Sequence, residues 1–176
     1  MKRFLIIVLL TAAIAGLALA FAGAGGGERR EADAYLRVHI RANSGSEEDQ
    51  RVKYLVRDKI VEFLTPTVAE CNTKAEAMQA VERKLSEAER VAERVLEEHG
   101  FFYGARASLR REEFPTRVYD EVTLAAGVYD ALILELGSGE GENWWCVVYP
   151  PLCFTGGNGN VVYRSKIAEI IKRFFN

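Results

Sequence analysis

The sequence has few of the side chains on which catalytic and metal sites are usually built. It holds two histidines and three cysteines in 176 residues, and no serine stands in a Gly-x-Ser-x-Gly frame. Its aspartates and glutamates show no spacing that isolates a general acid/base pair. His39 falls on the polar side of a predicted strand, and His99 at the end of a predicted helix, where the helix dipole alone favours a positive charge. We therefore predict no catalytic residue, no cofactor, no metal and no enzyme activity.

A large net charge and internal repeats are also absent. The formal net charge is −2, and because Lys2 and Arg3 contribute +2, the rest of the chain carries −4. A chain with this balance has no general attraction to nucleic acid. Hydrophobic residues make up 49% and charged residues 27%, as in an ordinary globular protein. About 150 residues follow the first two dozen, which is the size of one domain.

One long stretch, from Phe4 to Ala22, has no charged residue. Lys2 and Arg3 precede it and small residues crowd its end, as in an export signal. We predict that residues 1–24 form a leader removed by signal peptidase. An uncleaved membrane anchor is the alternative, because about 19 apolar residues can span a bilayer core. In both cases the basic end stays inside, and the remainder is exported.

The exported part is predicted to begin with a tether, residues 25–34, followed by a single domain, residues 35–176. The first strand alternates between residues that face a core and residues that face away from it: Leu36, Val38 and Ile40 against Arg37, His39 and Arg41. Ser46 and Asp49 form a variant of the capping box that starts a helix. We expect Pro66 to end this helix.

A second helical stretch begins at a capping box of Thr73 and Glu76 and runs to Gly100. Its apolar residues recur at steps of three and four, which predicts one long amphipathic helix: Met78, Val81, Leu85, Ala88, Ala92 and Val95. The stripe fits packing on a sheet of the same chain. It also fits a coiled-coil seam, although it is shorter than three to four heptads.

Three strands are predicted next, at residues 103–110, 128–136 and 145–149, and a short helix at residues 167–175. The order is therefore β-α-α-β-β-β-α. Strands grouped after helices predict an α+β fold in which helices pack on a mostly antiparallel sheet.

A glycine-rich loop, Gly137–Gly141, lies between the last two predicted strands. Such loops bind phosphate when a helix begins at their exit, whereas a strand follows here. We therefore favour a flexible hairpin connection.

Cys146 and Cys153 flank the segment Tyr149-Pro150-Pro151. In an exported protein, a local disulfide is one interpretation, worth roughly 2.5 kcal/mol in the chain-entropy model. Two buried thiols, or a catalytic or metal-binding pair, are the others. Cys71 is left over and is predicted to be a small buried hydrophobic residue.

Trp144 and Trp145 are the two tryptophans of the chain, and neighbours on a strand point to opposite faces. An exposed tryptophan beside prolines is typical of a protein-binding hot spot, whereas two rings that cap the core are the alternative. The candidate partner surface contains Asn143, Trp144, Trp145, Tyr149, Pro150, Pro151 and Phe154. Asn43, Ser44 and Asp49 are candidates to join it, although they also suit a turn and a helix cap.

Three stretches, in this order, resemble the signatures of the stage II sporulation protein R family: His39 to Ser44 with Glu47 to Gln50, Lys53 and Val56 to Asp58; Phe114 to Arg117 with Leu124 to Leu132; and Asn143 to Phe154. The resemblance covers Leu36 to Phe154, and its last stretch is highly specific. Two positions depart from the family pattern, which has proline at the place of Ala125 and an apolar residue at that of Arg41.

The resemblance implies a signalling protein of sporulation and no enzyme. Such a protein is exported from the forespore into the space between the forespore and mother-cell membranes. There it triggers a membrane-embedded aspartic protease, from its extracytoplasmic side, to process the precursor of sigma factor E. A cell-envelope hydrolase with a cysteine nucleophile and a small-molecule binding module are the alternatives.

Overall fold

A computed structural model describes residues 32–119 and 122–152. The chain divides into two compact units at Ala34/Tyr35, and the fold below is that of the second unit. The predicted leader, nearly all of the tether and the predicted C-terminal helix lie outside the described residues. Among the described residues, no helix is both long enough and apolar enough to cross a membrane.

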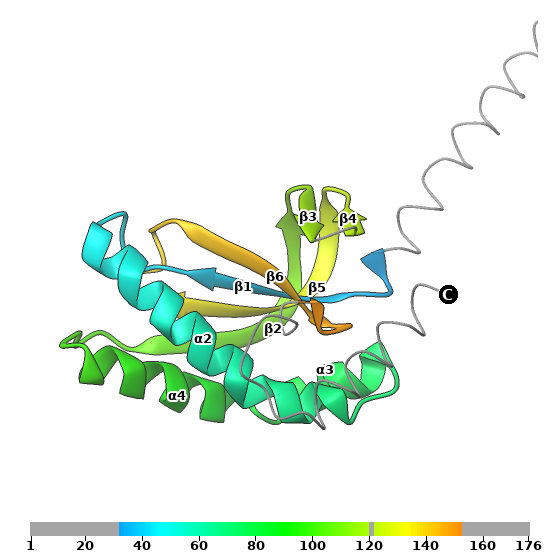
Figure 1. Cartoon of the computed structure of the whole chain (residues 1–176), viewed down its shortest axis with the longest axis horizontal. Helices are drawn as coiled ribbons and strands as arrows, with labels where there is room; N and C mark the ends of the chain where they lie inside the picture. Colours follow the sequence, from blue (N-terminus) through cyan, green and yellow to red (C-terminus); the bar gives the residue numbers. More distant parts are fainter. Residues whose placement is uncertain (1–31, 120–121, 153–176) are drawn as a thin grey trace, which may run out of the picture. The chain divides into compact units, whose positions relative to one another are not determined.

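The described part of the second unit is an α+β fold in which three helices lie on one side of a sheet (Figure 1). In chain order its elements are β1 (Leu36–Arg41), α2 (Glu47–Ala69), α3 (Lys74–Glu82), α4 (Leu85–Glu98), β2 (Ala105–Phe114), β3 (Arg117–Tyr119), β4 (Val122–Leu124), β5 (Gly127–Leu136) and β6 (Asn143–Tyr149). Four strands form one sheet in the order β2-β5-β1-β6, and β3 pairs with β4. The predicted fold class is confirmed for these residues.

The sheet is mixed, which refines the expectation of a mostly antiparallel one. Strand β5 is antiparallel to β2, and β6 is antiparallel to β1, whereas the central pair β1 and β5 is parallel. Parallel neighbours need a long crossover connection. Here all three helices and β2 intervene between β1 and β5, so the chain has the length for it.

The prediction that Pro66 ends the first helix is wrong, because α2 continues to Ala69 with Pro66 inside it. Proline removes one backbone donor from a helix and crowds the preceding turn. The residues beyond it, Val68 and Ala69, are fully buried in the core, so their packing offsets that loss. The predicted start is confirmed, because Ser46 accepts a hydrogen bond from the Asp49 amide at 3.2 Å.

The prediction of one long second helix is also wrong. The stretch forms α3 and α4, and Arg83 and Lys84 break it. No glycine or proline marks the break. At this point the amide of Lys84 bonds to the carbonyl of Val81, three residues back, instead of four. The break lets each helix pack separately, α3 beside α2 and β1, and α4 across α2 and β2.

The core lies between the helices and one face of the sheet, which we call the helix face. It contains the predicted apolar residues of β1 together with alternate residues of β5: Leu36, Val38, Ile40, Leu132, Leu134 and Leu136. The helices contribute a matching stripe that includes Val56, Ile60, Ala88, Ala92 and Leu96. Of the two readings of the α3–α4 stripe, packing on the chain's own sheet is therefore confirmed.

The hairpin of β3 and β4 was not predicted. Each strand has three residues, which is too short for a periodic pattern to be recognised. The hairpin extends beyond the ends of β2 and β5 (Figure 1). Strand β5 begins at Gly127, one residue before the predicted strand of residues 128–136.

Candidate functional site

The face of the sheet opposite the helices, which we call the second face, is buried at its centre. Arg37 and His39 were predicted to point away from a core, yet they are 0% and 1% exposed. The predicted direction is right, but this side of β1 is buried, because aromatic side chains of β2 and β6 cover both residues. The Phe114 ring lies 4.2 Å from the Arg37 guanidinium, and the Trp145 ring lies 3.6 Å from the His39 ring.

His39 sits at the centre of a polar network that crosses three strands. Its Nδ1 lies 2.6 Å from Oε1 of Glu112 on β2, and its Nε2 lies 2.7 Å from Oδ1 of Asn143 on β6. Its ring stacks on Trp145 with 22° between the ring planes. The network therefore joins β2, at one edge of the four-stranded sheet, to β6 at the other.

The protonation state of His39 is coupled to the orientation of Asn143. An imidazolium donates to both neighbouring oxygens. A neutral ring that donates from Nδ1 to Glu112 instead accepts at Nε2, and the Asn143 amide then turns its NH2 group toward it. Burial lowers the pKa of His39 from its ordinary value, although Asn143 and Glu112 act in the opposite direction. The neutral form, with Asn143 as donor, is thus favoured near neutral pH.

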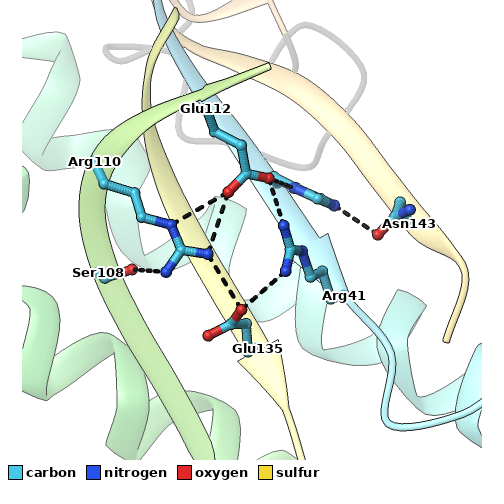
Figure 2. Close-up of polar contacts among 7 residues, drawn as sticks. Arg41, Ser108, Arg110, Glu112, Glu135 and Asn143 are labelled. Carbon is cyan, nitrogen blue, oxygen red and sulfur yellow. Dashed lines mark hydrogen bonds and ion pairs between the residues drawn. The ribbon is translucent and has the colours of Figure 1, made fainter. Parts of the chain in front are cut away.

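Four charged side chains form a closed ring beside His39, which we call the ion-pair ring (Figure 2). Arg41 lies 2.7 Å from Glu112 and 3.1 Å from Glu135, and Arg110 lies 3.2 Å from each of the same two carboxylates. Ser108 accepts a further hydrogen bond from Arg110 at 3.3 Å. The ring links β1, β2 and β5 and leaves every one of its charges paired.

Glu112 is shared by the ring and by His39. Burial raises the pKa of its carboxyl group, but hydrogen bonds from His39 and Arg41 outweigh that effect and bring the pKa below its ordinary value. Glu112 is therefore an acceptor for three cationic or polar side chains, and it stays ionised at neutral pH.

The two tryptophans lie on opposite faces, as predicted. Trp145 pairs with His39 on the second face, whereas Trp144 pairs with Ile40 on the helix face. The Arg57 guanidinium of α2 lies 5.6 Å from the centre of the Trp144 ring and 4.9 Å from that of Tyr54. Both tryptophans are half-buried, so neither is a pure core residue or a fully exposed one.

The candidate residues of the loop between β1 and α2 lie next to the start of β6. The amide of Ala42 donates to the carbonyl of Glu142 at 3.3 Å. Asp49 is 6% exposed, and its carboxylate accepts hydrogen bonds from Asn43 at 2.9 Å, Ser44 at 2.5 Å and Tyr103 at 2.6 Å. These partners hold the loop in place, so the turn and cap role is present whether or not a partner binds.

The glycine loop packs against the same β1–α2 loop, and it does not connect a hairpin, because β1 lies between β5 and β6. A Cβ on Gly141 would overlap the carbonyl of Ser44, and one on Gly137 would overlap the Asn43 side chain. The amides of residues 137–141 donate to acceptors within the chain: Gly104, Asn43, Leu136 and Ala42. All five amides of this loop are therefore already hydrogen-bonded and cannot bind a phosphate without losing a partner. This agrees with the prediction that the loop is not a phosphate-binding loop.

In the described part of the chain, Cys146 and His39 lie on opposite faces of the sheet, so they do not form a cysteine–histidine pair. Cys146 is 5% exposed, is disulfide-bonded and pairs with Val38 on the helix face, whereas His39 points to the second face. Its predicted partner Cys153 lies outside the described residues, so that pairing stays a prediction. Cys71 is a free, buried thiol, as predicted, and burial raises its pKa.

No group of three or more His, Cys, Asp and Glu side chains suited to a metal occurs in residues 32–119 and 122–152.

The structure divides the candidate partner surface. Asn143 is exposed and both tryptophans are half-buried, whereas Tyr149, Pro150 and Pro151, at the far end of β6, are buried. Phe154 lies outside the described residues. The reachable candidates are therefore at the start of β6, beside Asn43 and Ser44.

Sequence reasoning missed Arg37, Glu112, Arg110 and Glu135. A signal was present, because β1 and β2 both carry mostly polar or charged residues at alternate positions, on the side that the alternation leaves for solvent. Charges of opposite sign on neighbouring strands can pair on that side. What the pattern did not supply was the order of the strands.

Comparison with known proteins agrees with the resemblance. The family model described as stage II sporulation protein R matches residues 32–158. Stage II sporulation protein R of Bacillus subtilis (strain 168) is 34% identical over 142 residues, which are 80% of this chain and 63% of the relative. The chain thus spans less than two thirds of that relative's length. No solved structure matches this chain. The chain belongs to the stage II sporulation protein R family.

Proposed function

We propose that this chain is an exported signalling protein of sporulation that triggers a membrane-embedded aspartic protease to process the precursor of sigma factor E. Family membership carries this proposal, because the match covers most of the second unit. The uncharged stretch from Phe4 to Ala22 supports export from the forespore by the export machinery. The protein then acts between the two membranes, free if signal peptidase removes the leader and anchored if it does not.

The partner surface that we propose contains Asn143 and Trp145. The polar network fixes both side chains, because Asn143 contacts Nε2 of His39 and Trp145 stacks on the same ring. A surface held in its binding conformation loses less entropy when a partner binds. Trp144 is not included, because its ring lies on the helix face, where the Arg57 guanidinium packs over it.

Activation needs no chemistry from this chain. A ligand shifts a protease toward its active state if it binds that state more tightly than the inactive one. The rival reading is a hydrolase that uses Cys146 or Cys153 as its nucleophile. It is weakened for Cys146, which is disulfide-bonded and lies on the face of the sheet opposite to that of His39. A nucleophilic cysteine requires a free thiolate and a base within hydrogen-bond reach.

Co-expression tests the proposal. The full chain, the candidate protease and the sigma factor precursor are produced together in a bacterium that has none of them, and processing is followed by the size of the precursor. We expect processing with the chain and none without it. A version without residues 2–24 should fold but fail to trigger processing. Normal processing by that cytosolic version would refute the proposed topology, and no processing by the full chain would refute the activation itself.

A further inference from the structure

Arg37 differs from the two arginines of the ion-pair ring on the same face. Arg41 and Arg110 each pair with two carboxylates. Arg37 is 0% exposed, and no carboxylate of the described residues lies within ion-pairing distance of it. Its pKa is lowered by burial, yet a guanidinium keeps its proton in proteins. Among the described residues, this positive charge is therefore buried without a negative one beside it.

Three aromatic rings surround the Arg37 guanidinium, an arrangement that we call the aromatic cage. Its central carbon lies 4.2 Å from the centre of the Phe114 ring, 4.8 Å from that of Tyr129 and 5.7 Å from that of Tyr119. Its Nη2 donates to the Tyr119 hydroxyl at 2.6 Å. The cage thus comes from β2, β3 and β5, and it lies apart from Asn143 at the other end of the sheet.

Two donor atoms of Arg37 have no partner in the part of the chain that the structure describes. Nε and Nη1 are both buried, and neither has a hydrogen-bond partner among the described residues. Cation–π contacts with the rings offset part of the lost hydration, but they do not satisfy N–H groups. Buried charges in proteins are normally both paired and hydrogen-bonded. An acceptor that carries one negative charge would meet both needs.

We infer that the aromatic cage is a binding site for a small monocarboxylate. One carboxylate balances one guanidinium, and its planar pair of oxygens suits the donors of arginine. The Tyr119 hydroxyl, which accepts from Arg37, has its own O–H available to donate to the same anion. This site goes beyond the proposed signalling role and shares no residue with the Asn143 and Trp145 surface.

Thermal unfolding of the full-length chain tests the site, with sodium acetate as the probe against sodium chloride at equal ionic strength. A ligand that binds the folded state raises its melting temperature. We expect a rise of about 5 °C for the wild type when the acetate concentration is about ten times the dissociation constant. Arg37→Met, which keeps the apolar stem, should melt at the same temperature in both salts. Arg110→Met is the matched control, because it removes a paired arginine of the same face and should keep the full response to acetate.

Two further experiments complete the test. The first determines whether the negative charge comes from the chain itself, and the second uses the wild type alone, so that it does not depend on whether Arg37→Met folds. Asp120→Asn and Glu121→Gln together remove the acidic residues between β3 and β4. If the wild type shows no acetate response and this double variant gains one, the counter-charge comes from the chain, and the site is refuted. Carbon-13 acetate should show NOEs from its methyl group to the rings of Phe114 and Tyr129 in the wild type. Absence of those NOEs, or an equal response of wild type and Arg37→Met, would overturn the inference.

Discussion

The two faces of the sheet are both buried at their centres, but by different kinds of side chain. On the helix face, leucine, valine and isoleucine side chains of β1 and β5 pack against three helices. On the second face, Arg37 and His39 lie among aromatic rings and polar partners. Apolar burial is non-directional, whereas buried polar groups need specific partners. The packing of the helix face could therefore be made by many combinations of apolar side chains. The contacts of the second face instead require particular polar and aromatic residues at particular positions.

The largest expected effect is on the helix face. Leu134 is fully buried on β5 beneath the helices. Leu134→Ala should lower the free energy of unfolding by about 2–5 kcal/mol, because it removes apolar contact and leaves a cavity. Chemical denaturation measures it. A loss below about 1 kcal/mol would mean that the helix face is not the main source of stability.

A smaller effect is expected on the second face. Glu112→Gln keeps the size of the side chain but removes the charge that His39, Arg41 and Arg110 share. The loss should be about 1.5–3 kcal/mol, the range for hydrogen bonds to a charged group. Glu62→Gln is the control, because Glu62 is exposed and forms a surface pair with Lys59. Equal denaturation curves for the two variants would contradict the role of Glu112.

Acid should weaken the second face more than the helix face. The pKa of His39 is lowered by burial, so below its ordinary value of 6.5 the unfolded state binds the proton first, and stability falls with pH. Glu112 adds to this, because its folded pKa is below the ordinary 4.5, and its contribution is lost as pH falls through that folded value.

His39→Gln separates the two groups. It should remove the fall in stability that begins near pH 6.5 and leave the fall below pH 4.5. Melting temperatures between pH 7 and pH 3.5 give both phases. A wild-type curve that stays flat down to pH 4.5 would show that burial does not lower the pKa of His39.

The smallest effect is expected at the rim of the second face. Arg110 is partly exposed, and its two carboxylate partners also contact Arg41. Arg110→Met should cost about 1 kcal/mol or less, as for other solvent-accessible ion pairs. A loss as large as that of Glu112→Gln would mean that the ion-pair ring acts as one unit, which a double-variant cycle would then measure.

The helix face is the part of the fold that the sequence predicted well. Alternation in Leu36, Val38 and Ile40 identified β1, and the stripes of α3 and α4 identified what covers it. Local capping signals also held, as Ser46 and Thr73 show. The helix ends were predicted less well. Helix α2 continues past Pro66 because the residues after it pack in the core, and the second helical stretch is broken between α3 and α4 without a glycine or proline.

The second face was not predictable from a single pattern. Period-two alternation says that Arg37 and His39 share a side of β1, but burial of that side depends on which strands lie beside it. Phe114 reaches them because β2 extends four residues beyond the predicted strand. The opposite orientations of Trp144 and Trp145 followed from strand geometry alone, whereas the stacking of Trp145 on His39 required the register of β6.

The signalling role is tested most directly by comparing Trp145→Ala with Trp144→Ala in the co-expression assay, at equal amounts of folded protein and at a temperature where both remain folded. The account predicts that Trp145→Ala weakens activation of the protease by about 30-fold, a hot-spot loss of about 2 kcal/mol. Trp144→Ala should instead lower the melting temperature while activation stays near that of the wild type. Normal activation by Trp145→Ala would contradict the claim that the second face presents the partner surface.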